Sequence, residues 1–322
     1  MTQTVALVLG SGGARGYTHI GVIDEIESRG YKVVSVSGCS MGAIVGGFYS
    51  AGKLEPFRQW ATSLSYMDVI RLVDFSFISK GAIRGDKVFN LLAEMLDGQQ
   101  IEDLQMPFTA VATDLVNSKE VWFQRGSLEQ AIRASAAIPS LIKPVEHNGK
   151  IYVDGGVLNP LPIAPSVSAH ADHIIAVDLN SDSPLIPGVS ELSRQDFESG
   201  KQKREEQKQD WFDSVVDKAG QWISSAMSDS GDVALEEKAS VTANLGKLEI
   251  LYQMFEVMQA SLSQYKIAGY PPDLLVRMPQ DCCEIYEFHR AQEMIDLGRE
   301  VARQALDAYE QGHSSLYGQR LG

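Results

Sequence analysis

Two strand–turn–helix units follow one another within the first fifty residues, and glycine dominates both turns. Residues 5–9 form an apolar run, GSGGARG occupies positions 10–16, and a helical pattern then continues to Gly30. A second strand over 33–37 leads into the turn GCSMG at 38–42 and a helix of small residues. Repeated units of this kind place parallel strands side by side with crossover helices. The chain is therefore predicted to be an α/β protein with a mostly parallel central sheet flanked by helices.

Further strands are predicted over 107–113, 173–179 and 274–276, because each is a short apolar run. Residues 145–153 read as a hairpin, since Asn148-Gly149 separates two apolar stretches. A final helix is predicted over 284–309. We expect the strand near 274 to return to the first sheet. Residues 1–322 would then form a single domain, with its core at 5–180 and 270–310 and a helical insertion or lid at about 181–270.

The predicted insertion contains two apolar stripes with helical spacing. The first stripe consists of Trp211, Val215, Trp222 and Ala226. It is typical either of a helix packed on the core or of an amphipathic lid at an interface. The second stripe consists of Leu248, Leu251, Phe255, Met258 and Leu262. It is too short for a coiled coil, so a core helix and a short seam of a homodimer remain the alternatives.

The charge of the chain limits its partners. Lys and Arg number 28 and Asp and Glu number 42, for a net charge of −14. A surface this acidic argues against binding to nucleic acid and against electrostatic attraction to anionic lipid. Three cysteines form no disulfide framework, and no apolar run approaches the roughly 18 residues of a spanning helix. We expect a cytoplasmic protein, with peripheral contact at the inner membrane through apolar side chains as a further hypothesis.

The turn GCSMG contains a candidate nucleophile, Ser40. It matches G-x-S-x-G, a pattern that is weak alone because glycine and serine are common. Here it lies between a strand and a helix, where a sharp turn presents the serine at the end of a sheet. The following helix N-terminus favours negative charge near the hydroxyl. An ordinary tight turn is the structural alternative.

The first glycine-rich turn does not fit a dinucleotide site. A G-x-G-x-x-G fingerprint needs glycine where this chain has Arg15. A second glycine turn also stands where the acidic residue that binds ribose should follow. Successive glycines after a strand instead leave backbone amides free near a ligand. Beside a nucleophilic serine, such amides form an oxyanion hole.

A serine nucleophile needs a base, and none of the six histidines is well placed for that role. Asp154 is the better candidate, because it ends the hairpin strand in IYVDGG and two glycines let a substrate approach. The alternative is that Asp154-Gly155 is a plain turn.

GSGGARG, GCSMG and DGG in this order and spacing resemble the patatin-like phospholipases, in particular the bacterial branch similar to the catalytic domain of neuropathy target esterase. The segments ATDL (112–115) and ASAAIP (134–139) agree with this likeness. The resemblance implies a three-layer α/β fold without metal or other cofactor. It implies a Ser-Asp catalytic dyad of Ser40 and Asp154, and an oxyanion hole formed by Ser11, Gly12 and Gly13. Arg15 would either steady the glycine loop or contact a phosphate. Many members have three glycines where this chain has Ser11-Gly12-Gly13, which leaves the exact donor open.

These observations predict a serine esterase of lipid degradation, of the phospholipase A or lysophospholipase type, acting through an acyl-serine intermediate. Its substrate would be a phospholipid, a lysophospholipid or another acyl ester. Two alternatives stay open at this point. One is a general esterase or thioesterase with the same residues, and the other is a regulatory or scaffold protein with little turnover.

Overall fold

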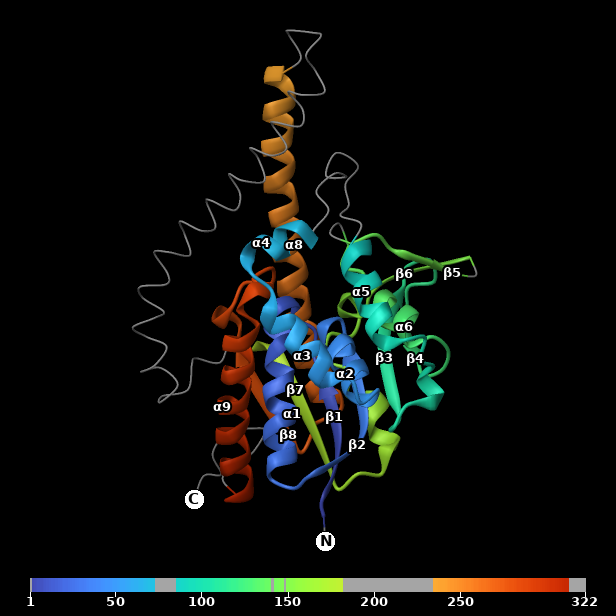
Figure 1. Ribbon diagram of the computed structural model, residues 1–322, viewed down its shortest axis with the longest axis vertical. Coiled ribbons are helices and arrows are strands. Elements are labelled where there is room, and N and C mark those ends of the chain that lie inside the picture. The colour runs from blue at the N-terminus through green and yellow to red at the C-terminus, as the bar shows by residue number, and fades with distance from the viewer. Residues whose placement is uncertain (1, 73–84, 140–141, 148, 182–233, 313–322) are drawn as a thin grey trace, which may run out of the picture. The chain divides into compact units, whose positions relative to one another are not determined.

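The computed structural model describes residues 2–72, 85–139, 142–147, 149–181 and 234–312. The chain divides into two compact units, residues 1–184 with 258–322 and residues 185–257. The first unit contains the sheet and every predicted site residue (Figure 1). Trp211, Val215, Trp222 and Ala226 lie outside the described residues.

The described part of the chain contains eight strands and eight α-helices. The strands are β1 Thr4–Leu9, β2 Lys32–Cys39, β3 Phe108–Asp114, β4 Lys119–Phe123, β5 Val145–His147, β6 Lys150–Asp154, β7 His173–Ser181 and β8 Leu274–Pro279. The helices are α1 Thr18–Ser28, α2 Met41–Ser50, α3 Leu54–Ser63, α4 Tyr66–Leu72, α5 Asp86–Leu96, α6 Leu128–Ser135, α8 Ala234–Gly269 and α9 Ala291–Glu310.

The strands form one sheet in the order β5-β6-β3-β2-β1-β7-β8, with β4 paired to β3. The run from β3 to β8 is parallel, whereas β4, β5 and β6 are antiparallel to their neighbours. The predicted α/β class and mostly parallel sheet are confirmed. So is the return of the late strand, because β8 pairs with β7 in the same sheet.

Side chains of β1 alternate between two buried layers, as expected for a central strand covered on both faces. Leu9 contacts α2 at Gly46. Val8 lies in a core cluster on the other face with Leu161 and Ile163. Helices α1 and α9 pack side by side, as Figure 1 shows. The sheet is therefore the middle layer of the first unit.

Strands β2 and β6 meet end to end along one edge of β3. The last β2–β3 pair joins Cys39 to Val111, and the next β3 residue, Ala112, pairs with Asp154 of β6. Strand β4 occupies the opposite edge, because it pairs with β3 from Ala110 onward. The residue after Cys39 and the last residue of β6 consequently lie next to each other.

Two expectations about helices need correction. The final helix begins at Ala291, seven residues later than predicted, because a short loop with 3₁₀ turns precedes it. The core-helix interpretation of the second apolar stripe does not hold for Leu251 and Met258, which are 50% and 36% exposed. The buried residues at that end of α8 are polar, namely Gln259 and Ser263. The dimer seam stays a prediction.

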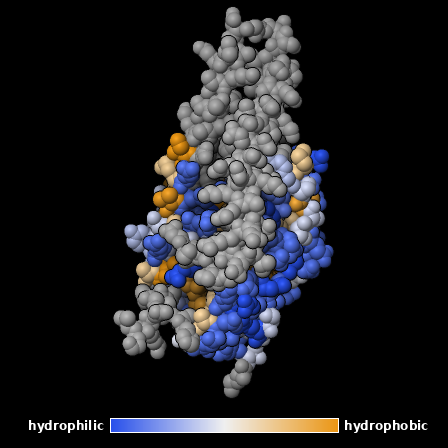
Figure 2. All heavy atoms as spheres, turned by 90° about the vertical axis from the view of Figure 1, so that its left-hand side faces the viewer, coloured by the Kyte–Doolittle hydropathy of each residue, from blue (hydrophilic) through white to orange (hydrophobic). Residues whose placement is uncertain are grey.

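The described part of the surface is mostly polar. Outside the grey residues, the face drawn in Figure 2 is largely hydrophilic, with small hydrophobic groups at its left edge. Among the described residues, Arg29, which directly follows α1, forms ion pairs with Asp307 and Glu310 of α9. No helix in the described ranges combines the length and apolar character needed to cross a membrane.

Candidate active site

Ser40 occupies a one-residue elbow between β2 and α2. Its backbone has φ 54° and ψ −121°, a conformation that costs a residue with a side chain on the order of 1–3 kcal/mol. Gly42 permits this elbow, because a Cβ there would lie 2.1 Å from the carbonyl oxygen of Leu9. Helix α2 can therefore begin directly against the end of β1. This arrangement holds Ser40 close to the glycine loop that follows β1.

Asp154 lies at the end of β6, beside the elbow. It is fully buried, and Ser40 is 3% exposed. The amide of Gly156 donates a 2.7 Å hydrogen bond to Oδ1 of Asp154, and the Cys39 thiol lies 3.9 Å from the same oxygen. Oδ2 is buried without a hydrogen-bond partner among the described residues. The structure thus places a buried carboxylate with one unsatisfied oxygen next to the elbow serine.

The environment of Asp154 makes it a stronger base than a carboxylate in water. Burial raises its pKa, while the neighbouring Ser40 hydroxyl and the Gly156 amide lower it, and the resulting pKa is about 6. The hydroxyl is close enough to have this effect without forming a hydrogen bond of ordinary geometry with Oδ2. Burial and the Asp154 charge raise the pKa of the Cys39 thiol well above its usual value, so Cys39 stays protonated.

Three successive carbonyls of the glycine loop each accept a hydrogen bond from a buried side chain. The imidazole of His19 lies 2.8 Å from the Gly10 oxygen, and Nδ2 of Asn180 donates to the Ser11 oxygen over 3.0 Å. Nε of Arg15 donates to the Gly12 oxygen over 3.3 Å. Because a carbonyl only accepts, the His19 nitrogen that faces Gly10 must carry a proton. These donors fix the orientation of the peptide units in the loop.

The loop amides differ in what they bind. The Ser11 amide donates to the Pro160 carbonyl over 2.8 Å and is therefore already used. The amides of Gly12 and Gly13 make no hydrogen bond to the described residues. Gly13 has φ +56°, and a Cβ there would lie 2.7 Å from the Ile285 carbonyl oxygen, so this position requires glycine. Of the three loop amides expected to form an oxyanion hole, those of Gly12 and Gly13 therefore remain without a hydrogen bond to the described residues.

Arg15 is only 2% exposed. Besides its bond to Gly12, it donates to the Gln280 carbonyl through Nη1 over 3.2 Å. The side chain thereby ties the loop to the segment after β8. This burial favours the loop-steadying role over contact with a phosphate.

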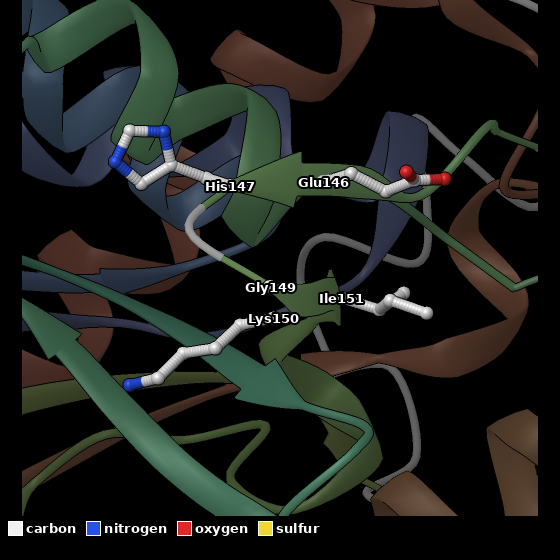
Figure 3. Close-up of a pocket in the computed structure, with 5 residues that line it drawn as sticks. All are labelled: Glu146, His147, Gly149, Lys150 and Ile151. Atoms are coloured by element: carbon white, nitrogen blue, oxygen red, sulfur yellow. The ribbon is translucent and has the colours of Figure 1, made fainter.

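Among the residues that the structure describes, the remaining titratable groups do not form a second catalytic constellation. Burial lowers the pKa of His19 to about 4. Its protonated ring nitrogen is bonded to the Gly10 carbonyl, so His19 is not placed to act as the base for Ser40. Within the described ranges, no group of three His, Cys, Asp or Glu residues is arranged to hold a metal ion. A hollow of about 370 Å³ lies at the β5–β6 hairpin. Figure 3 shows its Glu146 and His147 side chains pointing away from each other, so they build no site there.

Sequence reasoning assigned no role to three buried polar residues around the site: His19 of α1 and Asn180 of β7, which bind carbonyls of the glycine loop, and Ser135 at the end of α6. His19 carried a signal, because it falls on the apolar face that Val22, Ile23 and Ile26 define. A polar residue on a buried face needs a partner. Asn180 carried no comparable signal, and Ser135 stood out only as part of the segment ASAAIP (134–139).

A strained serine elbow, a buried carboxylate and two loop amides without a hydrogen bond to the described residues lie together at one end of an α/β sheet, an arrangement of the kind that serine hydrolases use. Comparison with known proteins identifies the family. Residues 7–167 match the family model described as patatin-like phospholipase. An uncharacterised NTE family protein of Mycobacterium tuberculosis is 41% identical, over 95% of this chain and 92% of its own length. The chain therefore belongs to the patatin-like phospholipase family, in its NTE branch.

Other relatives share only part of their length with this chain. Patatin-like phospholipase domain-containing protein 6 of Homo sapiens is 26% identical over 97% of this chain and 21% of its own length. The lysophospholipase NTE1 of Cryptococcus neoformans is 32% identical over 58% of this chain and 12% of its own. Among solved structures, VipD from Legionella pneumophila aligns with 96% of this chain and 67% of its own, at TM-score 0.41 and 14% identity.

Proposed function

We propose that the protein is a serine lipid acyl hydrolase with Ser40 as nucleophile and Asp154 as its base. Membership of the patatin-like phospholipase family supports lipid hydrolase activity, and one fungal relative is itself named a lysophospholipase. The observation that carries the assignment of residues is the strained elbow at Ser40 beside the buried carboxylate of Asp154. A protein that only binds has no need of a strained serine next to a buried charge.

In the proposed reaction, Asp154 accepts the hydroxyl proton as Oγ of Ser40 attacks the ester carbonyl carbon. The amides of Gly12 and Gly13 stabilise the negative charge that develops on the carbonyl oxygen. The carbon–oxygen bond to the leaving alcohol then breaks, the alcohol takes the proton from Asp154, and an acyl-serine remains. Asp154 next deprotonates a water molecule, which hydrolyses the acyl-serine and releases the fatty acid.

Membership of the family supports a lipid substrate, and the head group and chain length are open to measurement. We propose phospholipids and lysophospholipids as substrates and place general esters and thioesters second. Exposed apolar side chains on α8, such as Met254 and Val257, support peripheral membrane contact or a homodimer. Flotation with zwitterionic liposomes and analytical ultracentrifugation test these two hypotheses separately.

Labelling with a fluorophosphonate probe tests the nucleophile, because the probe reacts only with an activated serine. We expect wild type to be labelled, Ser40→Ala to be unlabelled, and Ser50→Ala to be labelled like wild type. Ser50 is a matched control, since it is also buried and lies at the far end of α2. Hydrolysis of a phospholipid, a lysophospholipid and a short ester by the same variants tests the substrate class. Folded wild type that is neither labelled nor active would favour the regulatory alternative.

A further inference from the structure

The hydroxyl of Ser135 bridges the elbow that follows β2 and the neighbouring strand β3. Ser135 is the last residue of α6 and is fully buried. Its Oγ accepts a 2.9 Å hydrogen bond from the Ser40 amide and donates a 2.6 Å hydrogen bond to the Val111 carbonyl. The Ser135 hydroxyl therefore accepts one hydrogen bond and donates another, and so links the Ser40 amide to the Val111 carbonyl.

This bridge stands where the backbone ladder between β2 and β3 ends. The last backbone pair of that ladder is Cys39 with Val111, and the chain turns into the elbow at the next residue. The positive φ of Ser40 takes its amide out of the ladder, and a buried amide without a partner is strongly disfavoured. The Ser135 hydroxyl supplies that partner and adds one side-chain rung to the ladder.

The residues that follow Ser135 also position Asp154. The Asp154 amide donates a 2.9 Å hydrogen bond to the Ala137 carbonyl. The segment 135–137 thus holds the backbone of both residues of the proposed dyad, one through a side chain and the other through a carbonyl. Because β2 and β6 each pair with β3 and their backbones do not pair with each other, a shared anchor helps to fix the separation between Ser40 and Asp154.

We infer that Ser135 is a positioning residue that holds the nucleophile elbow in register with Asp154; this inference rests on the proposed function. Loss of the hydroxyl removes the partner of the Ser40 amide without touching any reacting atom. The elbow then relaxes, and displacement of a nucleophile by about an ångström lowers the rate on the order of 100-fold.

The test is turnover of a short chromogenic ester by Ser135→Ala, expressed per active site titrated with a fluorophosphonate. We expect kcat and the rate constant of labelling to fall roughly 10- to 100-fold, with KM changed much less. Ser135→Thr keeps a hydroxyl and should restore most of the rate. If Ser135→Ala does not fold, Ser135→Cys fills nearly the same space with a weaker donor and acceptor, and should show the same loss to a smaller degree.

Ser50→Ala is again the matched control, because it removes a buried hydroxyl that has no hydrogen-bond partner in the described structure. A purely structural role for Ser135 would lower the amount of labelled protein and leave the rate per labelled site unchanged. That outcome would overturn the inference and leave the proposed function intact. If folded wild type is not labelled, or if Ser40→Ala is labelled to the same extent as wild type, both the inference and the proposed function are overturned.

Discussion

The Gly156 amide donates to one carboxylate oxygen of Asp154, and the other oxygen of Asp154 is buried with no hydrogen-bond partner among the described residues. A buried carboxylate with one oxygen lacking a hydrogen-bond partner is a stronger base than a carboxylate in water. In the proposed function, this basicity is what lets Asp154 activate Ser40 without a histidine. The first two predictions follow from it.

The first prediction concerns the pH dependence of activity. Asp154 must be ionised to accept the Ser40 proton, and its pKa is about 6. Ester hydrolysis should therefore fall as the pH drops through about 6 instead of near the ordinary aspartate value. A profile of kcat/KM from pH 4.5 to 8 with an uncharged ester measures this limb. The labelling rate of the fluorophosphonate should follow the same curve, and activity that is level down to pH 4.5 would contradict the assignment.

The second prediction concerns Asp154→Asn. Turnover should fall by roughly 10³-fold, since the general base is lost. The folded-state pKa lies above the unfolded value of 3.8. The Asp154 carboxyl therefore contributes to the stability of the fold below pH 3.8, and this contribution is lost as the pH rises through about 6. At pH 7 the ionised carboxylate costs the fold at most about 3 kcal/mol.

Urea unfolding of wild type and Asp154→Asn at pH 4.5, 6 and 7.5 checks the sign of this effect. The variant should gain stability relative to wild type as the pH rises, because asparagine has no charge to bury. A difference that stays constant across the three pH values would show that Asp154 is not the group responsible. Circular dichroism at each pH confirms that the two proteins share a fold.

The third prediction concerns His19, whose burial has the opposite consequence. Its pKa is lowered from 6.5 to about 4. The unfolded chain binds a proton in that interval and the folded chain does not. Stability from this group is therefore complete above pH 6.5 and decreases as the pH falls toward 4, by about 3 kcal/mol in total.

His19→Gln should abolish this contribution and still donate to the Gly10 carbonyl. Urea unfolding of wild type and this variant at pH 7 and pH 4.5 measures the difference. We expect the variant to lose less stability than wild type between the two pH values. Equal losses in the two proteins would mean that His19 is accessible to protons in the folded state.

The fourth prediction separates the two roles considered for Arg15. A residue that steadies the glycine loop affects every ester, whereas one that contacts phosphate affects only substrates that carry it. Because Arg15 donates to two backbone carbonyls, Arg15→Met should lower the rates of hydrolysis of a phospholipid and of a phosphate-free ester by similar factors. Rates on both substrates, with the unfolding midpoint as a check on folding, decide the question. A loss confined to the phospholipid would restore the phosphate role.

Much of this molecule could be predicted from local patterns. The apolar run before each glycine turn gave β1 and β2, Asn148-Gly149 gave the β5–β6 hairpin, and the run near 274 gave a strand that returns to the sheet. Such patterns act over a few residues, through burial and backbone preference, so a single sequence reveals them. The same reasoning named Ser40, Asp154 and the glycine loop as candidates, because each is a residue type of known chemistry in a distinctive local context.

Only the tertiary structure decided which groups meet and with what bonds. That β2 and β6 share one edge of β3 cannot be deduced from either strand, because strand pairing joins residues far apart in the chain. The Ser11 amide is occupied by Pro160, and Ser135 bridges Ser40 to Val111, through contacts of the same long-range kind. Burial, which sets the pKa values of Asp154 and His19, is likewise a property of the packed fold. The sequence by itself determined the elements and the candidate chemistry, whereas long-range packing determined the geometry and the protonation of the site.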